Sequence, residues 1–261
     1  FKVFFPSLTG VVAFWATVAL NIPDFSRHAK TQKSQILGQS LGLPLSMAFI
    51  SFIGIAVASA TVVIFGEAIW DPVQILTKFP PFFVILGTIG VILASLTINV
   101  GANVIAPARA FENINPKKFT FGMGVIVTGL LGILMQPWYL MANFGNYIFG
   151  WLGTYGALLG PLDGIAIADY WLVRRTHLSL TELYLYDSRY NYAGGFNKKA
   201  IYAFIIGVAI TLLGLVIPPL HFLWANALVF GFFAAMISYT YLMKNDKSIL
   251  AAEEYHSITE Q

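Results

Sequence analysis

Ala94-Ser95-Leu96-Thr97-Ile98-Asn99-Val100-Gly101-Ala102-Asn103 places two carboxamides in the inner half of an apolar run that extends from residue 80 to residue 106. Such a run is long enough to cross a bilayer, for which about 20 residues suffice. A buried amide without a partner is costly in hydrocarbon, so these groups are expected to face protein, water or a ligand. Because Asn99 and Asn103 are four residues apart, a helix places them on one face. Thr97 lies on a different face, close to the stripe of Ala94.

The composition is that of a polytopic membrane protein. Of the 261 residues, 57% are hydrophobic and only 10% are charged, whereas a soluble domain carries about 25% charged residues. The chain has no cysteine, which excludes disulfides and thiolate metal sites. We expect an all-α integral membrane protein.

Apolar segments of about 20 residues predict about seven transmembrane helices, at residues 3–22, 42–65, 81–106, 119–139, 147–172, 200–217 and 222–242. All of the 15 basic residues except Lys2 and Lys78 follow the first, third, fifth and seventh of these spans. The positive-inside rule therefore predicts a cytoplasmic C-terminus and an external residue 1. Because the sequence starts inside an apolar segment and without Met, we expect it to be the C-terminal part of a longer protein.

The first predicted span contains Trp15 well inside the apolar segment, away from the interfacial belt where membrane tryptophans concentrate. Its indole is either a packing element or a flat wall for a planar ligand. The span is followed by Asn21-Ile22-Pro23-Asp24, and we expect Pro23 to end the helix at Ile22.

The fifth predicted span is rich in residues that weaken a helix, namely Gly153, Gly156, Gly160 and Pro161. They predict a helix that bends easily. Close packing against another helix and a gate are both open as explanations.

Two acids lie in the same span. Asp163 is near the middle of the membrane, where an acid is by default a candidate proton carrier or cation partner; a water-filled cavity beside a bent helix is the alternative. Asp169 lies near the inner end, close to Arg174 and Arg175, and we expect it to be a structural ion partner.

The remaining segments are assigned by composition. Residues 173–199 predict a loop folded onto the cytoplasmic face, and residues 200–243 a two-helix C-terminal hairpin that turns at Pro218-Pro219. Residues 244–261 predict a charged cytoplasmic tail. We find no HExxH, GxSxG or phosphate-cradling motif, so no enzymatic activity is expected.

At several motifs the sequence resembles a known family, the nucleobase–cation symporters, which include hydantoin, allantoin and uracil permeases. The motifs follow the family's order over nearly the whole chain: Phe14-Trp15-Ala16-Thr17, Leu20-Asn21-Ile22-Pro23-Asp24-Phe25, Asn99-Val100-Gly101-Ala102-Asn103, Gly160-Pro161, Gly164-Ile165, Ala168-Asp169-Tyr170-Trp171 and Gly194-Gly195-Phe196-Asn197. Each motif is weak alone, and together they are specific.

The resemblance implies a LeuT-like transporter of twelve helices, built from two inverted five-helix repeats and two extra helices. Residues 1–172 would be the second repeat, helices six to ten of the presumed parent, followed by the extra pair. The N-terminal half of such a protein, which would complete the site, is then a missing partner of this chain.

The resemblance also implies roles for single residues. Trp15 matches the family's stacking tryptophan, and Asn99 and Asn103 match the amides that hydrogen-bond the substrate. The family's Na⁺ site uses a carbonyl that matches Ala94 and two adjacent hydroxyls that match Thr97 and Ile98. Since Ile98 offers no oxygen, H⁺ coupling through Asp163 is the rival to Na⁺.

We therefore expect a symporter of the plasma (inner) membrane that imports a nucleobase or related cyclic ureide with Na⁺ or H⁺, and with no other cofactor and no nucleic acid. Three alternatives are a non-transporting scaffold or sensor of the same fold, an inactive fragment and a membrane enzyme.

Overall fold

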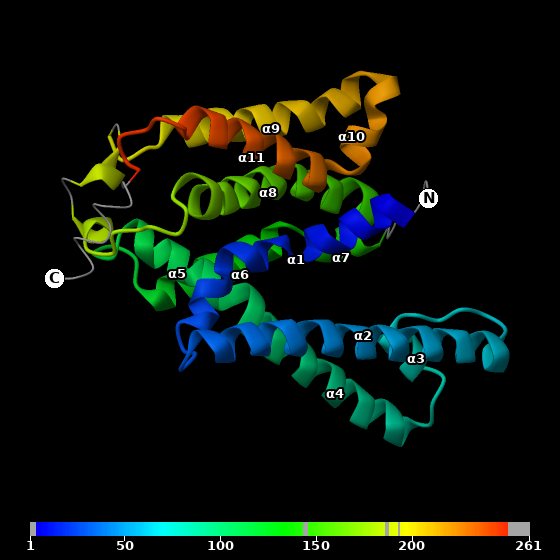
Figure 1. Ribbon diagram of the computed structural model, residues 1–261. Coiled ribbons are helices and arrows are strands. Elements are labelled where there is room, and N and C mark those ends of the chain that lie inside the picture. The colour runs from blue at the N-terminus through cyan, green and yellow to red at the C-terminus, as the bar shows by residue number, and fades with distance from the viewer. Residues whose placement is uncertain (1–3, 143–145, 186–187, 193, 250–261) are drawn as a thin grey trace. The chain divides into compact units, whose positions relative to one another are not determined.

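The computed structural model describes residues 4–142, 146–185, 188–192 and 194–249, and the regular elements in these ranges are helices (Figure 1). The chain divides into two compact units, one formed by residues 1–21 with 137–261 and the other by residues 22–136. Residues 250–261 of the predicted tail lie outside the described residues.

The apolar helices agree with the predicted spans. Among the described residues, six helices are long and apolar enough to cross a membrane: Phe4–Ser26, Gln32–Phe65, Pro81–Ile114, Phe121–Tyr139, Leu152–Val173 and Lys198–Val216. A seventh span results if the bent pair Pro218–Ala225 and Ala227–Met243, which meet at 87°, counts as one. The all-α membrane class predicted from composition is confirmed.

Four longer helices form the core of the first unit: α1 (Phe4–Ser26, of which the part up to Asn21 belongs here), α8 (Leu152–Ile167), α9 (Lys198–Val216) and α11 (Ala227–Met243). Shorter elements connect them: α7 (Pro137–Met141), the π-helical segments η2 (Asn146–Trp151) and η3 (Ala168–Val173), the 3₁₀ turns η4 (Glu182–Tyr184), η5 (Arg189–Asn191) and η6 (Pro218–Leu220), and α10 (His221–Ala225). The turn predicted at Pro218 and Pro219 contains η6, which begins with these two residues.

Glycines bring α8 into backbone contact with α11. A Cβ added at Gly160 would lie 2.2 Å from the carbonyl oxygen of Leu228, and one added at Gly164 would lie 2.3 Å from that of Phe232. No side chain fits at either position without movement of the neighbouring backbone. Small residues allow this close approach in membranes, where packing rather than hydrophobic burial holds helices together.

The first helix joins this core through alanines. Ala13 and Ala16 of α1 are buried against Leu159 of α8 and Leu228 of α11. The hydroxyl of Thr9 lies 3.1 Å from Asn226 Oδ1, to which it donates a hydrogen bond.

The prediction that Pro23 ends the first helix at Ile22 is wrong, because α1 continues to Ser26 with Pro23 inside it. A proline inside a helix removes the hydrogen bond that its own amide would donate and crowds the carbonyl four residues earlier, but it leaves the following amides free to continue the helix. The helix after it is retained, and the amide of Arg27 still donates to the Pro23 carbonyl at 3.1 Å. The next helix is started by Thr31, whose hydroxyl accepts from the Ser34 amide.

The second unit contains α2 (Gln32–Phe65), α3 (Pro72–Leu76), α4 (Pro81–Asn99), the π-helical segment η1 (Val100–Val104), α5 (Ile105–Ile114) and α6 (Phe121–Leu134). A Cβ at Gly124 of α6 would lie 2.5 Å from the carbonyl oxygen of Ala108 in α5, so these two helices also touch through their backbones.

Large apolar side chains remain exposed along the spans of this unit. Phe52, Ile55 and Val63 of α2 are 70%, 69% and 86% exposed. Apolar faces of this extent need apolar surroundings, which supports their placement in a membrane.

The contact between α8 and α11 generates a stability prediction. Gly160→Ala should destabilise the protein by about 1–3 kcal/mol, because the added methyl group meets the Leu228 backbone. Thermal unfolding of the detergent-purified protein should show a lower midpoint. Gly153→Ala is the matched control in the same helix, since nothing lies within 4 Å of a Cβ there. Equal midpoints for both variants would contradict the contact.

Candidate functional site

Asn99 and Asn103 form a chain of amides at the end of α4. Asn99 Nδ2 donates to the Ser95 carbonyl at 2.8 Å, and Asn103 Nδ2 donates to Asn99 Oδ1 at 2.8 Å. Both side chains are exposed. The spacing of four residues therefore brings the two amides together, as the sequence predicts.

The helix changes form between the two amides. Asn99 is the last residue of α4, and Asn103 lies in the π-helical segment η1; such segments occur frequently at functional sites. Each amide nitrogen has a second N–H, and Asn103 Oδ1 makes no hydrogen bond to the residues that the structure describes. The pair can thus offer adjacent donors and an acceptor to a ligand edge.

Ala94 and Thr97, the candidate Na⁺ residues, lie in α4 of the same unit. The Thr97 hydroxyl donates to its own helix, to the Leu93 carbonyl at 2.7 Å, and its oxygen can still accept or coordinate. Ile98 has only carbon in its side chain. Ala94 and Thr97 could supply only part of the coordination shell of Na⁺, because a hard cation takes about six oxygen ligands. Within the described ranges, no group of three His, Asp or Glu side chains could hold a metal ion.

Trp15 lies in α1, in the first unit. Its indole is half-buried and meets Phe14 edge to face, with ring centroids 5.7 Å apart and planes at 82°. A half-buried indole can both pack against its own helix and offer a face to a flat ligand.

The candidate gate residues of α8 have different surroundings. Gly156 and Gly160 lie in the contact with α11, where a Cβ at Gly156 would be 3.2 Å from that of Leu228. Pro161 is fully buried, and a Cβ at Gly231 would lie 2.9 Å from it. Gly153 has open space instead. Close packing accounts for three of the four residues, and the gate stays a prediction.

Asp163 is half-buried in α8. Its Oδ1 is buried and has no hydrogen-bond partner in the described part of the chain. A buried carboxyl oxygen without a partner is costly, which makes it a candidate for binding a proton or a cation.

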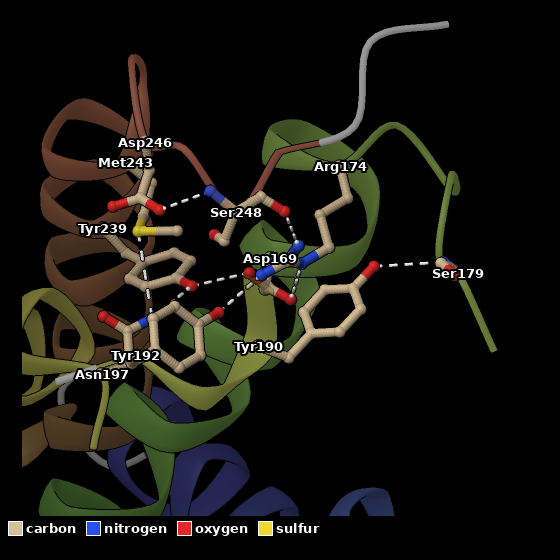
Figure 2. Close-up of polar contacts among 10 residues, drawn as sticks. All are labelled: Asp169, Arg174, Ser179, Tyr190, Tyr192, Asn197, Tyr239, Met243, Asp246 and Ser248. Carbon is tan, nitrogen blue, oxygen red and sulfur yellow. Dashed lines mark hydrogen bonds and ion pairs between the residues drawn. The ribbon is translucent and has the colours of Figure 1, made fainter. Parts of the chain in front are cut away.

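In contrast, both carboxylate oxygens of Asp169 have hydrogen-bond partners, as Figure 2 shows. Its Oδ2 accepts from Arg174 Nε at 2.7 Å, and its Oδ1 accepts from the Tyr239 hydroxyl at 2.6 Å. The prediction of a structural ion partner is confirmed for Arg174.

Arg174 joins three segments that are far apart in the sequence. Its guanidinium donates to the Tyr192 hydroxyl at 2.6 Å and to the Ser248 carbonyl at 2.9 Å, and it lies over the ring of Tyr190. Burial alone would lower the pKa of Arg174, but the hydrogen bond and the charge of Asp169 outweigh burial and raise that pKa above its ordinary value. Arg174 therefore stays charged and holds the loop and the segment after α11 against η3.

Sequence reasoning missed Tyr239 and Ser248 in this cluster. Both are buried, and they lie 70 and 74 residues from the partners that they bind. The signal available for Tyr239 is a polar aromatic residue within the last apolar span.

The saturation of Asp169 generates a second stability prediction. Tyr239→Phe should cost about 1.5–3 kcal/mol, because it removes a hydrogen bond to a charged group. Tyr241→Phe, the same change on a side chain that is 79% exposed, should leave the unfolding midpoint unchanged. A midpoint for Tyr239→Phe equal to that of the control would refute the role of this hydrogen bond.

Comparison with known proteins agrees with the membrane fold and with the motifs. A family model described as permease for cytosine/purines, uracil, thiamine, allantoin matches residues 1–243. The chain is 42% identical to the purine-uracil permease NCS1 of Arabidopsis thaliana, over 92% of this chain and 42% of that protein. It is 39% identical to the allantoin permease of Bacillus subtilis, over 92% of this chain and 49% of that protein.

Two further similarities connect sequence and fold. The hydantoin permease of Microbacterium maritypicum is 32% identical, over 80% of this chain and 44% of that protein. The solved inward facing conformation of Mhp1 matches with a TM-score of 0.73 and 27% identity, over 98% of this chain and 55% of that one. The chain spans about half the length of the curated relatives it matches. The chain belongs to the family of permeases for cytosine/purines, uracil, thiamine and allantoin.

Proposed function

We propose that this protein is a secondary active transporter that imports a nucleobase or related cyclic ureide, of the uracil, allantoin or hydantoin type, together with a cation. The observation that carries the proposal is the exposed amide pair Asn99 and Asn103 at a π-helical segment in a membrane span. The names of the relatives, which are permeases for such compounds, support it.

A cyclic amide suits this pair because its N–H and C=O groups alternate along one edge. Asn103 Oδ1 accepts from a ring N–H, and the remaining N–H groups of Asn99 and Asn103 donate to ring carbonyls. Trp15 lies in the other unit; its role as a stacking tryptophan, which the resemblance implies, stays a prediction and suits an indole, because indoles prefer offset stacking on planar rings.

The coupling ion in this proposal is H⁺, with Na⁺ as the second candidate. The Na⁺ site that the resemblance implies has a hydroxyl ligand at the position of Ile98, which offers no oxygen, so only Ala94 and Thr97 remain as ligands. Asp163, in contrast, has a buried carboxyl oxygen without a partner among the described residues. A carboxyl group that binds and releases a proton in a span can couple a proton gradient to transport.

The same proposal covers orientation and movement. The chain lies in the plasma (inner) membrane with its C-terminus in the cytoplasm, as the distribution of lysine and arginine favours. Residues 1–172 act as the second repeat and residues 200–243 as a scaffold hairpin. Gly153, Gly156, Gly160 and Pro161 form the part of α8 that moves on closure, and transport proceeds without a catalytic site.

Removal of the amide at position 103 tests the substrate site. Asn103→Ala should weaken uptake of uracil, allantoin or hydantoin by about thirtyfold in apparent affinity, since two neutral hydrogen bonds contribute about 1 kcal/mol each. The measurement is uptake of radiolabelled substrate by cells that express the protein from its complete coding sequence.

Asn113→Ala, on an exposed asparagine of α5, is the matched control and should transport normally. Unchanged affinity of Asn103→Ala across the whole panel would remove this residue from the site. Substrate binding without accumulation in proteoliposomes would favour a sensor or scaffold of the same fold.

The coupling ion is tested by replacing sodium with choline at fixed pH. Uptake should persist, and it should respond to an imposed pH gradient in the wild type but not in Asp163→Asn. Glu67→Gln, a change in an exposed ion pair with Lys78, should keep the response. Loss of uptake in choline would instead identify Na⁺ as the driver.

A further inference from the structure

A hollow of about 540 Å³ lies in the first unit, beside the beginning of α9 and the segment that follows α11. It is lined by basic, aromatic and hydroxyl side chains, among them Arg189, Phe196, Lys198, Lys199, Lys247 and Ser248. None of these residues belongs to the proposed transport site.

The walls of this hollow are fixed by the cluster around Asp169. Asn197 caps α9, accepting from the amides of Lys199 and Ala200 at 3.1 and 3.2 Å, and its Nδ2 donates to the Tyr239 hydroxyl at 3.2 Å. On the other side, Arg174 holds the Ser248 carbonyl (Figure 2). Hydrogen bonds therefore fix the segments that form two sides of the hollow.

Only some of the basic side chains that line the hollow have an acidic partner. Arg189 is paired with Glu182, and Lys199 Nζ lies 2.8 Å from Asp246 Oδ2. Lys198 and Lys247 are exposed, and neither makes an ion pair within the part of the chain that the structure describes. Two lysine ammonium groups are thus left to attract an anion.

The hollow also lies at the end of two membrane helices. The span α9 begins at Lys198 and α11 ends at Met243, so we expect both lysines to lie near the membrane surface. Phe196, on the lining, is 67% exposed. An apolar phenyl ring beside cationic side chains suits insertion at the boundary between headgroups and acyl chains.

We propose that this hollow binds the phosphate group of an anionic membrane lipid. Lysine is a common phosphate ligand that acts as a point charge, and basic pockets next to membrane helices bind anionic headgroups. Free phosphate offers the same chemical group. The position of the hollow at the ends of two membrane helices and the exposed Phe196 favour a lipid over free phosphate as the ligand.

The test is a binding measurement on the protein purified in neutral detergent. Phosphatidylglycerol is titrated and bound lipid is counted by native mass spectrometry, with phosphatidylcholine and inorganic phosphate as parallel ligands. Retention of phosphatidylglycerol, little affected by millimolar phosphate, is expected. Lys198→Gln with Lys247→Gln should lower the apparent affinity by about 25-fold, since each lysine near an anionic surface contributes about fivefold.

The matched control is Lys117→Gln with Lys118→Gln, which removes the same charge from two exposed lysines in the second unit. Equal losses in both double variants, or no loss in either, would overturn the site. Binding of inorganic phosphate without preference for phosphatidylglycerol would overturn the lipid as its source. If the first double variant does not fold, Lys247→Gln alone, outside any helix, should still lose about fivefold. Transport is not measured, so this proposal and the transport proposal fail independently.

Discussion

The exclusion of water from the spans constrains this structure most, because each polar side chain there needs a partner in the protein, a ligand or a cavity. Asp169 meets that requirement completely: both carboxylate oxygens accept hydrogen bonds, and Arg174 uses its other donors on Tyr192 and Ser248. The Arg174 side chain is buried and that of Asp169 is half-buried, so removing Asp169 would leave a buried charge without its partner, which is costly. The cluster therefore holds η3, the loop that contains Tyr192 and the C-terminal end of α11 together.

Other polar groups in the spans meet the same requirement only in part. Asn103 Oδ1 and Asp163 Oδ1 lack partners among the described residues. The Asp163 oxygen is buried, where a missing partner is costly, and the exposed Asn103 lies in a span that we expect to exclude water. Such groups are expected where a ligand completes the hydrogen bonding. The contrast between satisfied and unsatisfied groups is the physical reason to give Asp169 a structural role and to propose a role in transport for Asn103 and Asp163.

The sequence predicts contacts between residues that are close along the chain and misses those between distant residues. Spans follow from local apolar composition, the pairing of Asn99 with Asn103 from a spacing of four residues, and Asp169 with Arg174 from a separation of five. Tyr239 lies 70 residues from Asp169, and no local pattern indicates which helix it faces. Pro23 misleads because a proline signals a lost hydrogen bond, whereas the continuation of the helix depends on the bonds that remain.

The packing of α8 limits where a gate in that helix can bend. At Gly160 the backbone of α8 touches that of α11, and Gly156 lies against Leu228, so a bend there must either carry α11 along or open a void in a close contact. Pro161 is enclosed by Gly207 and Gly231, which strengthens the constraint. Gly153 has no neighbour within 4 Å of a Cβ position. Within the proposed gate, Gly153 is therefore the position where a hinge would leave the contact with α11 intact, whereas movement at Gly156, Gly160 or Pro161 would have to carry α11 with it.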